Sequence, residues 1–515
     1  MIQLIKHPVL SNFIVCLLLF LTASICFNNV YINDKEISFI VVSIILSLLN
    51  CKTSDKIISF ICSLLTLILY IVFFDNYVFL LIGEILLAIY FVYRNKNNKF
   101  TYTISIILLS FLLHLFYIQQ TPLNRRQHDL GGIILYIRMI SESISNFNPW
   151  HMYYLFHQPL HFIISGYILD IASFFYSSYY TYIETLQFLS LFYVSASTVY
   201  FSLILRELRI KGLLFYSLLL LFAFNPTLTL FSGYISDDTP VFFWSTFVIY
   251  YTIKWYKTDI LKYLCFAAVG IGIGTLTKIS ILMITPALSI LFLHKLLASK
   301  YKKQIIFQLS IFIIIAVPIA LIWITRNHVL YDMQFFNVPD TSPAGQNFRN
   351  LSLYERLFDF ANITTIFISA PNIADNNILI SLIKTELFGE WNLSEIANIV
   401  YTPSAILYIL NIALKSFVFA SCIYIITQFL LRKKISIFYI FFTLLYLTIY
   451  LYSIKYSIDF PYVCSSDYRL FAQVNIAELI ILGYPFCNKK ADKLLLVGAI
   501  CYAFLSSFIY VAILL

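Results

Sequence analysis

Long apolar runs separated by short polar links dominate the pattern of this chain. The runs are roughly 17 to 22 residues long, the length that a helix needs to cross a hydrocarbon core of about 30 Å. Cut at its polar links, the sequence gives about fifteen such segments, with no soluble domain between them. The pattern therefore predicts an all-α polytopic membrane protein.

The predicted spans fall into groups along the chain. The first run, from Val9 to Phe27, is too long and too plainly followed by further spans to be a cleaved signal peptide. The predicted organisation has four parts: residues 1–100 with about four spans, a membrane core at 101–325 that contains a large external loop at 119–185, an external loop or small lid region at 326–402, and C-terminal spans at 403–515.

Composition supports the membrane class and argues against others. The chain is 61% hydrophobic and 11% charged, and its mean hydropathy is +0.85, which is too apolar for a soluble globular protein. Nine cysteines lie mostly inside apolar runs without a CxxC pair, so neither disulfides nor a zinc–thiolate site is indicated. The net charge of +9 is spread over the ends of spans and does not indicate a nucleic-acid partner.

The Lys and Arg clusters predict the topology, because basic residues accumulate in short cytoplasmic loops of a plasma (inner) membrane protein. All clusters lie inside if the run from Leu160 to Ser178 does not cross, so this run is expected to be an interfacial or re-entrant helix. Its aromatic end, SFFYSSYYTYIE, suits a membrane surface. The N-terminus is then cytoplasmic and the C-terminus external. The clusters contain Lys6; Lys52 and Lys56; Arg94, Lys96 and Lys99; Arg206, Arg209 and Lys211; Lys254, Lys257 and Lys262; Lys295, Lys300, Lys302 and Lys303; Arg432, Lys433 and Lys434; Lys489, Lys490 and Lys493.

The segment LNRRQHDLGG stands at the start of the first external loop. Arg125 and Arg126 on the outer face run against the positive-inside trend, which indicates a local purpose; binding of outer-leaflet phosphates or simple solvation is the alternative. Asp129 beside His128, followed by GG and an apolar helix, is typical of a functional acid at a helix start. Capping of that helix is the structural alternative for Asp129, and a buried position beside the arginines would keep its carboxylate ionised.

Three other external features carry candidate chemistry. Four of the eight histidines lie between His128 and His161, in a loop that contains NPWHMYYLFHQPLHF. The segment SDDTP places Asp237 and Asp238 at the start of a span, where capping explains one acid better than two. The long segment at 326–402, which includes SLIKTELFGEWN, is the natural lid or substrate-recognition element.

The order of these motifs and their common side of the membrane are informative together. The motifs are QHD (Asp129), HQPL (His157 to Leu160), FNP with SDDTPVFF (Asp238), LTK (Lys278) and DYRLF (Tyr468, Arg469). Over residues 101–515 this pattern resembles the GT-C superfamily of membrane glycosyltransferases, most closely the family 39 or protein mannosyltransferase-like enzymes and the aminoarabinose transferases. It departs from that pattern at Gln158, in the doubled acid and in the reversed Arg-Tyr order.

The resemblance implies a GT-C-like helical bundle that moves a sugar from a polyprenyl-phosphate donor to a glycan, lipid or protein acceptor on the outer face. Such a transfer needs a base for the acceptor hydroxyl and cations for the charge that develops on the phosphate. Asp129 is the candidate base, Asp238 would orient the acceptor or bind a metal, and single displacement would invert the anomeric centre. The candidate donor-phosphate residues are Arg469, Lys278 and Arg326, and the candidate substrate-binding or orienting residues are His128, Arg126, His157 and Tyr468.

Alternatives remain open at this point. A divalent cation, Mn or Zn, is one of them, with His128, Asp129, His157 and Asp238 as suitable ligand types. A lipid-linked oligosaccharide polymerase or ligase is another alternative, which Arg-rich motifs in the late external loop would favour. Beyond Arg326, this loop contains Arg349 and Arg356. A flippase or transporter would place paired charges at mid-span and broken helices in matching halves. The mid-span residues Glu84, His114 and Lys415 show no pairing in the sequence, and GIGIG at 270–274 is the one segment that suggests a broken helix.

Overall fold

The computed structural model of this chain describes most of residues 99–513. The described residues are 99–121, 123, 127, 129–142, 144, 147–150, 156–174, 179–335, 351–368, 375, 377–391, 393, 398–487 and 492–513. The predicted N-terminal group of about four spans, together with Arg125, Arg126 and His128, lies outside these residues.

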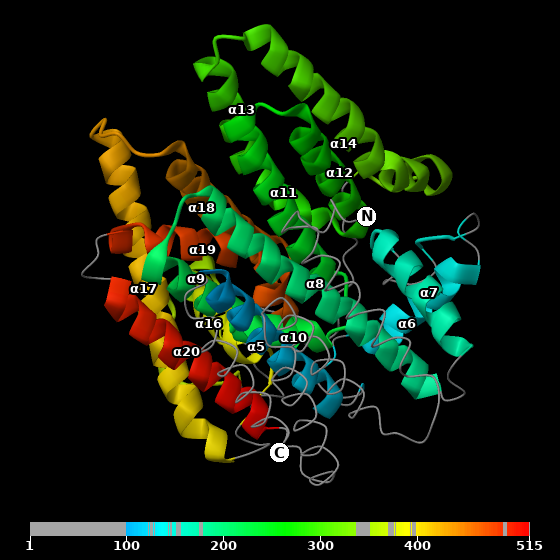
Figure 1. Cartoon of the computed structure of the whole chain (residues 1–515). Helices are drawn as coiled ribbons and strands as arrows, with labels where there is room; N and C mark the ends of the chain where they lie inside the picture. The colour runs from blue at the N-terminus through cyan, green and yellow to red at the C-terminus, as the bar shows by residue number, and fades with distance from the viewer. Residues whose placement is uncertain are drawn as a thin grey trace, which may run out of the picture.

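Within the described ranges the protein is all-helical, as the sequence predicts, and contains no β-strand. Short 3₁₀ turns join some of the helices, among them η2 (Ile279–Ile284), η6 (Val463–Ser466) and η7 (Tyr468–Phe471). The α-helices, shown in Figure 1, are α5 (Lys99–Gln120), α6 (Leu130–Glu142), α7 (Leu160–Ser173), α8 (Tyr179–Glu207), α9 (Gly212–Ala223), α10 (Pro226–Gly233), α11 (Asp238–Thr258), α12 (Leu261–Thr277), α13 (Thr285–Ala298), α14 (Lys302–Tyr331), α15 (Leu353–Phe358), α16 (Ile378–Phe388), α17 (Tyr401–Leu430), α18 (Ile437–Asp459), α19 (Val474–Gly483) and α20 (Asp492–Ala512).

Several of these helices are long and apolar enough to cross a membrane, so the protein is membrane-embedded. In the described part of the chain seven helical segments qualify, or eight if α9 and α10, bent by 42° between them, form one broken span. The figure of about fifteen spans is therefore not confirmed. Helix α7 has 14 residues, or about 21 Å at 1.5 Å per residue, which is too short to cross and agrees with the prediction that this run does not span.

The spans differ in how far they face their surroundings. In the most apolar 18-residue stretch of α8, 83% is buried inside the protein, whereas in that of α14 only 17% is buried. Helix α8 packs against α11, α10 and α5, and α14 packs on α12 at the edge of the bundle (Figure 1). The outer face of α14 carries exposed apolar side chains such as Phe307, Ile314 and Ile322, as expected where a helix contacts lipid.

The glycine-rich segment GIGIG does not break its helix, so that interpretation is wrong. It lies inside the continuous helix α12, between α11 and α14. A Cβ atom at Gly270 would lie 2.8 Å from the ring of Phe247 on α11, and one at Gly272 would lie 2.8 Å from Ile319 on α14. The glycines therefore let three helices approach closely, which is how small residues work in membrane bundles.

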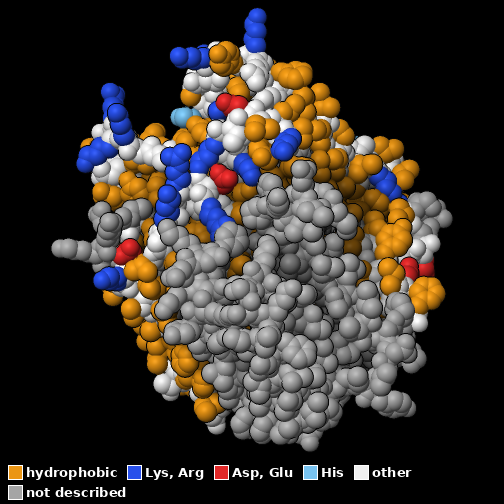
Figure 2. Space-filling model, in the orientation of Figure 1, with side chains coloured by type: hydrophobic (Ala, Val, Ile, Leu, Met, Phe, Trp, Pro, Cys, Tyr) orange, Lys and Arg blue, Asp and Glu red, His pale blue; other side chains and the backbone are white. Residues whose placement is uncertain are grey.

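The basic turns gather at one end of the bundle. Lys300, Lys302 and Lys303 at the α13–α14 turn are exposed or half-exposed, and so are the basic residues of the α17–α18 turn. Figure 2 shows Lys and Arg side chains toward the upper part of the molecule in that view, above hydrophobic flanks. Helix α11 runs from Asp238 to the basic end at Lys257, a length of about 29 Å. Its first residues therefore lie at the other end of the bundle from its own basic cluster.

Candidate functional site

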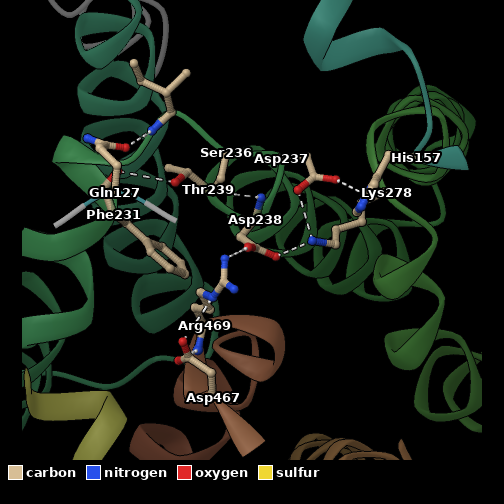
Figure 3. Close-up of polar contacts among 11 residues, drawn as sticks. Gln127, His157, Phe231, Ser236, Asp237, Asp238, Thr239, Lys278, Asp467 and Arg469 are labelled. Carbon is tan, nitrogen blue, oxygen red and sulfur yellow. Dashed lines mark hydrogen bonds and ion pairs between the residues drawn. The ribbon is translucent and has the colours of Figure 1, made fainter. Parts of the chain in front are cut away.

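Four segments that are far apart in sequence bring polar side chains together at that other end. They are the residue His157 before α7, the turn that leads into α11, the turn between α12 and η2, and η7 (Figure 3). Helix α10 starts after the sharp turn at Asn225, whose side chain accepts a hydrogen bond from the N–H of Thr227 at 2.9 Å, with Pro226 in the first turn. The short helix then delivers the chain to Asp237 and Asp238.

Neither aspartate caps α11 with its side chain, so the capping alternative is wrong here. Asp237 occupies the N-cap position without a side-chain cap hydrogen bond, and the N–H of Asp238 instead donates to Ser236 Oγ at 3.4 Å. Both carboxylates turn to Lys278, which stands in extended conformation directly after α12 (Figure 3). Asp237 and Asp238 thus form tertiary ion pairs with Lys278 instead of capping the helix.

Ion pairs connect these segments into one group, which we term the first ion network: His157, Asp237, Asp238, Lys278, Asp467 and Arg469. Lys278 Nζ lies 2.9 Å from Asp237 Oδ1 and 2.6 Å from Asp238 Oδ1. His157 Nδ1 lies 2.9 Å from Asp237 Oδ2. Arg469 Nε donates to Asp467 Oδ2 at 3.0 Å, and its Nη1 lies 3.5 Å from Asp238 Oδ2 (Figure 3). Asp238 therefore bridges Lys278 and Arg469.

The cations of this network lie nearer to the surface than the acids. The side chains of Asp238 and Asp467 are 3% exposed, whereas those of Lys278 and Arg469 are 16% and 13% exposed, and that of His157 is 28% exposed. Asp238 Oδ2 is buried and accepts no hydrogen bond of ordinary length. A ligand that approaches from the exposed side therefore meets an imidazole, an ammonium and a guanidinium before it meets a carboxylate.

Electrostatics fix the charges of this network. Burial alone would raise the pKa of Asp237, but the neighbouring Lys278 and His157 hold that pKa well below its usual range. Burial likewise opposes the charged form of Lys278, yet Asp237 and Asp238 raise its pKa above the usual value, and Asp467 and Asp238 raise that of Arg469. Both cations are therefore permanently charged.

Asp129 lies at the edge of this network. Gln127 binds the turn before α11, because its Nε2 donates to the carbonyl of Gly233 at 2.5 Å and its Oε1 accepts the N–H of Ile235 at 3.1 Å. Asp129 follows in left-handed conformation (φ 52°), and its carbonyl accepts the N–H of Ile133 at the start of α6. Its side chain is exposed, so the expectation of a buried carboxylate is wrong.

Glu390, in the turn after α16, is a second acid beside the network. Burial raises the pKa of Glu390 to about 7, with further contributions from the nearby Asp467 and Asp129 that Arg469 opposes in part. A carboxyl group with this pKa exchanges protons near neutral pH. The sequence alone assigns it no role. Its position directly after Gly389 (φ 61°) at the end of α16 was the available signal.

Two of the predicted site residues lie elsewhere. Arg326, near the end of α14, donates to the carbonyls of Ile144 at 3.1 Å and Phe147 at 2.7 Å, and it stacks on Trp323 with its Cζ 4.3 Å from the ring centroid. It holds the loop that follows α6. Tyr468 turns away from its neighbour Arg469 into the bundle core.

Tyr468 belongs to a second ion network, formed by Lys415, Glu386 and Glu478 with the neutral donors Asn225, Asn411, Tyr450 and Tyr468. Lys415 Nζ lies 2.8 Å from Glu386 Oε2 and 2.5 Å from Glu478 Oε2. The expectation that Lys415 is unpaired is therefore wrong. Its partners come from α16 and α19, 29 residues before and 63 residues after it, and the local sequence pattern does not reveal such pairs.

The metal-binding alternative has no matching ligand set in the described residues. In the part of the chain that the structure describes, no group of three or more His, Cys, Asp or Glu side chains is arranged to hold a metal ion. His128, one of the four proposed ligands, lies outside that part. His157 and Asp238 are described, and they bind Asp237 and Lys278 respectively.

Sequence comparisons add no further assignment to this geometry. No protein-family model and no curated protein sequence matches the chain.

Proposed function

We propose that this protein is a membrane glycosyltransferase that moves a sugar from a polyprenyl-phosphate donor to a glycan, lipid or protein acceptor on the outer face of the membrane. The observation that carries the proposal is the convergence of His157, Asp238, Lys278 and Arg469 in one ion network, with Asp129 at its edge. These residues come from segments that are separated by up to several hundred positions, and each offers a group that the reaction needs.

Lys278 and Arg469 suit the phosphate of the donor. Carboxylates behind them hold both cations in place, and the cations are the more exposed members of each pair. Arg469 uses its Nε on Asp467 and its Nη1 on Asp238. Its remaining N–H groups, with the third N–H of Lys278, are available to the phosphate oxygens as negative charge develops on the leaving group.

Asp129 suits the role of general base for the acceptor. In this reaction the acceptor oxygen bonds to the anomeric carbon while its proton passes to the carboxylate of Asp129. The bond from the anomeric carbon to the phosphate oxygen breaks, and polyprenyl phosphate leaves with the electron pair. This single displacement inverts the anomeric centre. Asp238, which binds Lys278 and Arg469, positions both cations.

The position of the network along the bundle supports an external site. The helices α11 and α18 both have a basic cluster at one end and the network at the other: Lys257 and Asp238 for α11, and Lys434 and the segment before Asp467 for α18. Because basic clusters mark the cytoplasmic side, the network falls on the opposite side. Donors that carry their sugar on a polyprenyl phosphate present it at that surface.

A lipid-linked saccharide transporter is the second candidate, and one observation favours it. The second ion network puts paired charges in the bundle core, which is where transporters keep groups that bind substrates or protons. Movement of a fluorescent polyprenyl-phosphate sugar between leaflets of vesicles, without release of polyprenyl phosphate, would favour the transporter over the transferase.

The test of the transferase is one substitution with a matched control. Purified protein in nanodiscs is given undecaprenyl phosphoglucose, phosphogalactose or phosphomannose with solubilised membranes as acceptor, and released undecaprenyl phosphate is measured. Asp129→Asn keeps the shape and tolerates the left-handed backbone, but cannot accept a proton, so release should fall about 100-fold or more at unchanged donor binding. Asp332→Asn, an exposed aspartate with φ 55° at the end of α14, should behave as wild type.

Two results would contradict the proposal. If wild-type protein releases undecaprenyl phosphate from none of the three donors, the transferase activity is rejected. If Asp129→Asn turns over at the wild-type rate, the catalytic assignment of Asp129 is rejected, and Glu390→Gln becomes the next variant to measure.

A further inference from the structure

A row of buried polar side chains without partners runs along one face of α7. Gln158, His161 and Ser165 are spaced by three and four residues, so they lie on the same side of the helix start. They are 4%, 2% and 0% exposed, and among the described residues Gln158 Oε1, both ring nitrogens of His161 and Ser165 Oγ have no hydrogen-bond partner. We term this row the α7 polar stripe.

Such a row is costly unless something satisfies it. A buried polar atom without a hydrogen bond loses the water that it bound in the unfolded chain, and the folded protein gains nothing in return. Most buried polar atoms in proteins are satisfied, so four unsatisfied atoms on one helix face are unusual. Water or a ligand with hydrogen-bonding groups would satisfy them.

The stripe begins beside the first ion network. Gln158 directly follows His157, a member of that network, and the backbone carbonyl of His157 accepts a hydrogen bond from the Tyr136 hydroxyl at 2.6 Å. A ligand whose charged group lies on Lys278 and Arg469 would therefore have its neighbouring atoms at the stripe. The stripe is a continuation of the candidate active site along α7.

The chemistry of the stripe suits hydroxyl groups. Burial lowers the pKa of His161 to about 4, so its ring is neutral at physiological pH and has one donor and one acceptor nitrogen. Gln158 Oε1 accepts only, and Ser165 Oγ both donates and accepts. A phosphate or carboxylate offers acceptors alone and would leave Gln158 unsatisfied, whereas a hydroxyl both donates and accepts.

We propose that Gln158, His161 and Ser165 form the subsite that binds the sugar ring of the lipid-linked donor through its hydroxyl groups. This inference rests on the proposed function, because it places the sugar next to the phosphate that Lys278 and Arg469 bind. The stripe then determines which sugar is accepted, while the ion network binds the part that all polyprenyl-phosphate donors have in common.

The test uses the full chain in nanodiscs and four probes: undecaprenyl phosphate without a sugar, and its glucose, galactose and mannose esters. Dissociation constants and melting temperatures are measured for wild type, His161→Phe, Gln158→Met and Ser165→Ala. Wild type should bind at least one sugar lipid about tenfold more tightly than the bare lipid. Each variant should lose that preference, keep its affinity for the bare lipid, and melt at a higher temperature, because an unsatisfied polar group has been replaced by an apolar one.

His114→Phe is the matched control. His114 on α5 is also buried, at 1% exposed, with both ring nitrogens unpartnered. It lies within the membrane span Tyr102–Gln120, whereas the α7 polar stripe begins directly after His157 of the first ion network. This variant should also melt at a higher temperature, but it should keep the full preference for the sugar lipid.

Three other results would contradict the inference. If wild type binds bare and sugar lipids equally, polyprenyl phosphate binding stands and the stripe holds water. If the three variants keep the sugar preference, or all melt below wild type, the stripe is part of the packing and not a subsite. If wild type binds neither kind of lipid, the proposed function fails, and the subsite fails with it.

Discussion

The two ion networks contain similar residues but differ in how completely they are closed. In the second network every carboxylate oxygen accepts a hydrogen bond or ion pair: Asn225 and Asn411 donate to Glu386, and Tyr450 and Tyr468 donate to Glu478, in addition to Lys415. In the first network Asp238 Oδ2 has a distant Arg469 as its sole partner in the described ranges, and His157 reaches the surface.

This difference separates a structural network from one that can bind a ligand. Two neutral donors on each of the two buried carboxylates, in addition to Lys415, leave no carboxylate oxygen for a ligand, and any rearrangement would leave a charge uncompensated. In the first network the carboxylates accept hydrogen bonds mainly from the ionisable side chains of Lys278 and Arg469. These two side chains have further N–H groups that can donate to a ligand. We therefore expect substitutions in the second network to affect folding and those in the first to affect activity.

The largest effect should follow from Lys415→Met. The change leaves Glu386 and Glu478 as buried carboxylates without a cation, at a cost of about 3–5 kcal/mol in the free energy of unfolding. Little folded protein should be recovered, as measured by size-exclusion chromatography and thermal melting in detergent. Lys278→Met should lower the free energy of unfolding by less, because Asp237 is still paired with His157 and Asp238 with Arg469. Sugar transfer should nevertheless be lost in this variant.

Two controls sharpen this comparison. Lys433→Met, at an exposed lysine of the α17–α18 turn, should leave the melting temperature unchanged. Lys415→Met combined with Glu386→Gln and Glu478→Gln should recover part of the loss, because the uncompensated charges are removed. An equal loss of stability for Lys415→Met and Lys278→Met would break the distinction between the networks.

Arg469→Lys should lower transfer substantially without unfolding the protein. Lysine still reaches one of the two aspartates, but a single ammonium cannot replace the planar guanidinium that contacts Asp467, Asp238 and a phosphate together. The ratio kcat/KM should fall by roughly 10- to 100-fold, measured by release of undecaprenyl phosphate. Arg432→Lys at an exposed arginine is the control, and unchanged turnover of Arg469→Lys at saturating donor would rule out the phosphate role.

Glu390→Gln should change how stability depends on pH. Burial and nearby acids raise the pKa of Glu390 from 4.5 to about 7, so the folded protein binds this proton more tightly than the unfolded chain does. The resulting stability is fully present below pH 4.5 and is lost as the pH rises to about 7. The melting temperature of wild type should therefore fall relative to Glu390→Gln across this range. Parallel profiles of the two proteins would contradict the raised pKa.

Chelation should have the smallest effect. Because Lys278 and Arg469 supply fixed positive charge at the proposed phosphate position, turnover should change by less than about twofold after exhaustive treatment with EDTA. Purified protein is assayed before and after treatment. Loss of turnover that Mn or Zn restores would instead support the metal alternative with His128, Asp129, His157 and Asp238.

The sequence predicted the elements better than it predicted their contacts. Long apolar runs identify helices and membrane embedding, because span length and hydropathy are local properties. Motif positions identified His157, Asp238, Lys278 and Arg469, which the structure brings together. The structure places these side chains in one ion network, while their roles in binding and catalysis remain predictions.

The errors concern properties that depend on distant parts of the chain. Lys415 had no visible partner because Glu478 lies 63 residues later, inside a short apolar helix. The glycines of GIGIG were interpreted as a break because their partners, Phe247 and Ile319, lie on other helices. Arg326 was assigned to phosphate by its charge alone, and the carbonyls that it binds near Phe147 could not be recognised from the sequence.

The short helix η7 makes activity depend on complete assembly. Its consecutive residues Tyr468 and Arg469 point into different networks, and the N–H of Tyr468 is held by Thr385 Oγ1 at 2.9 Å. A molecule whose second network has not formed has no fixed position for Arg469. Incompletely folded molecules should therefore be inactive rather than weakly active, and the rate per folded molecule should stay constant when growth temperature or detergent changes the yield of folded protein.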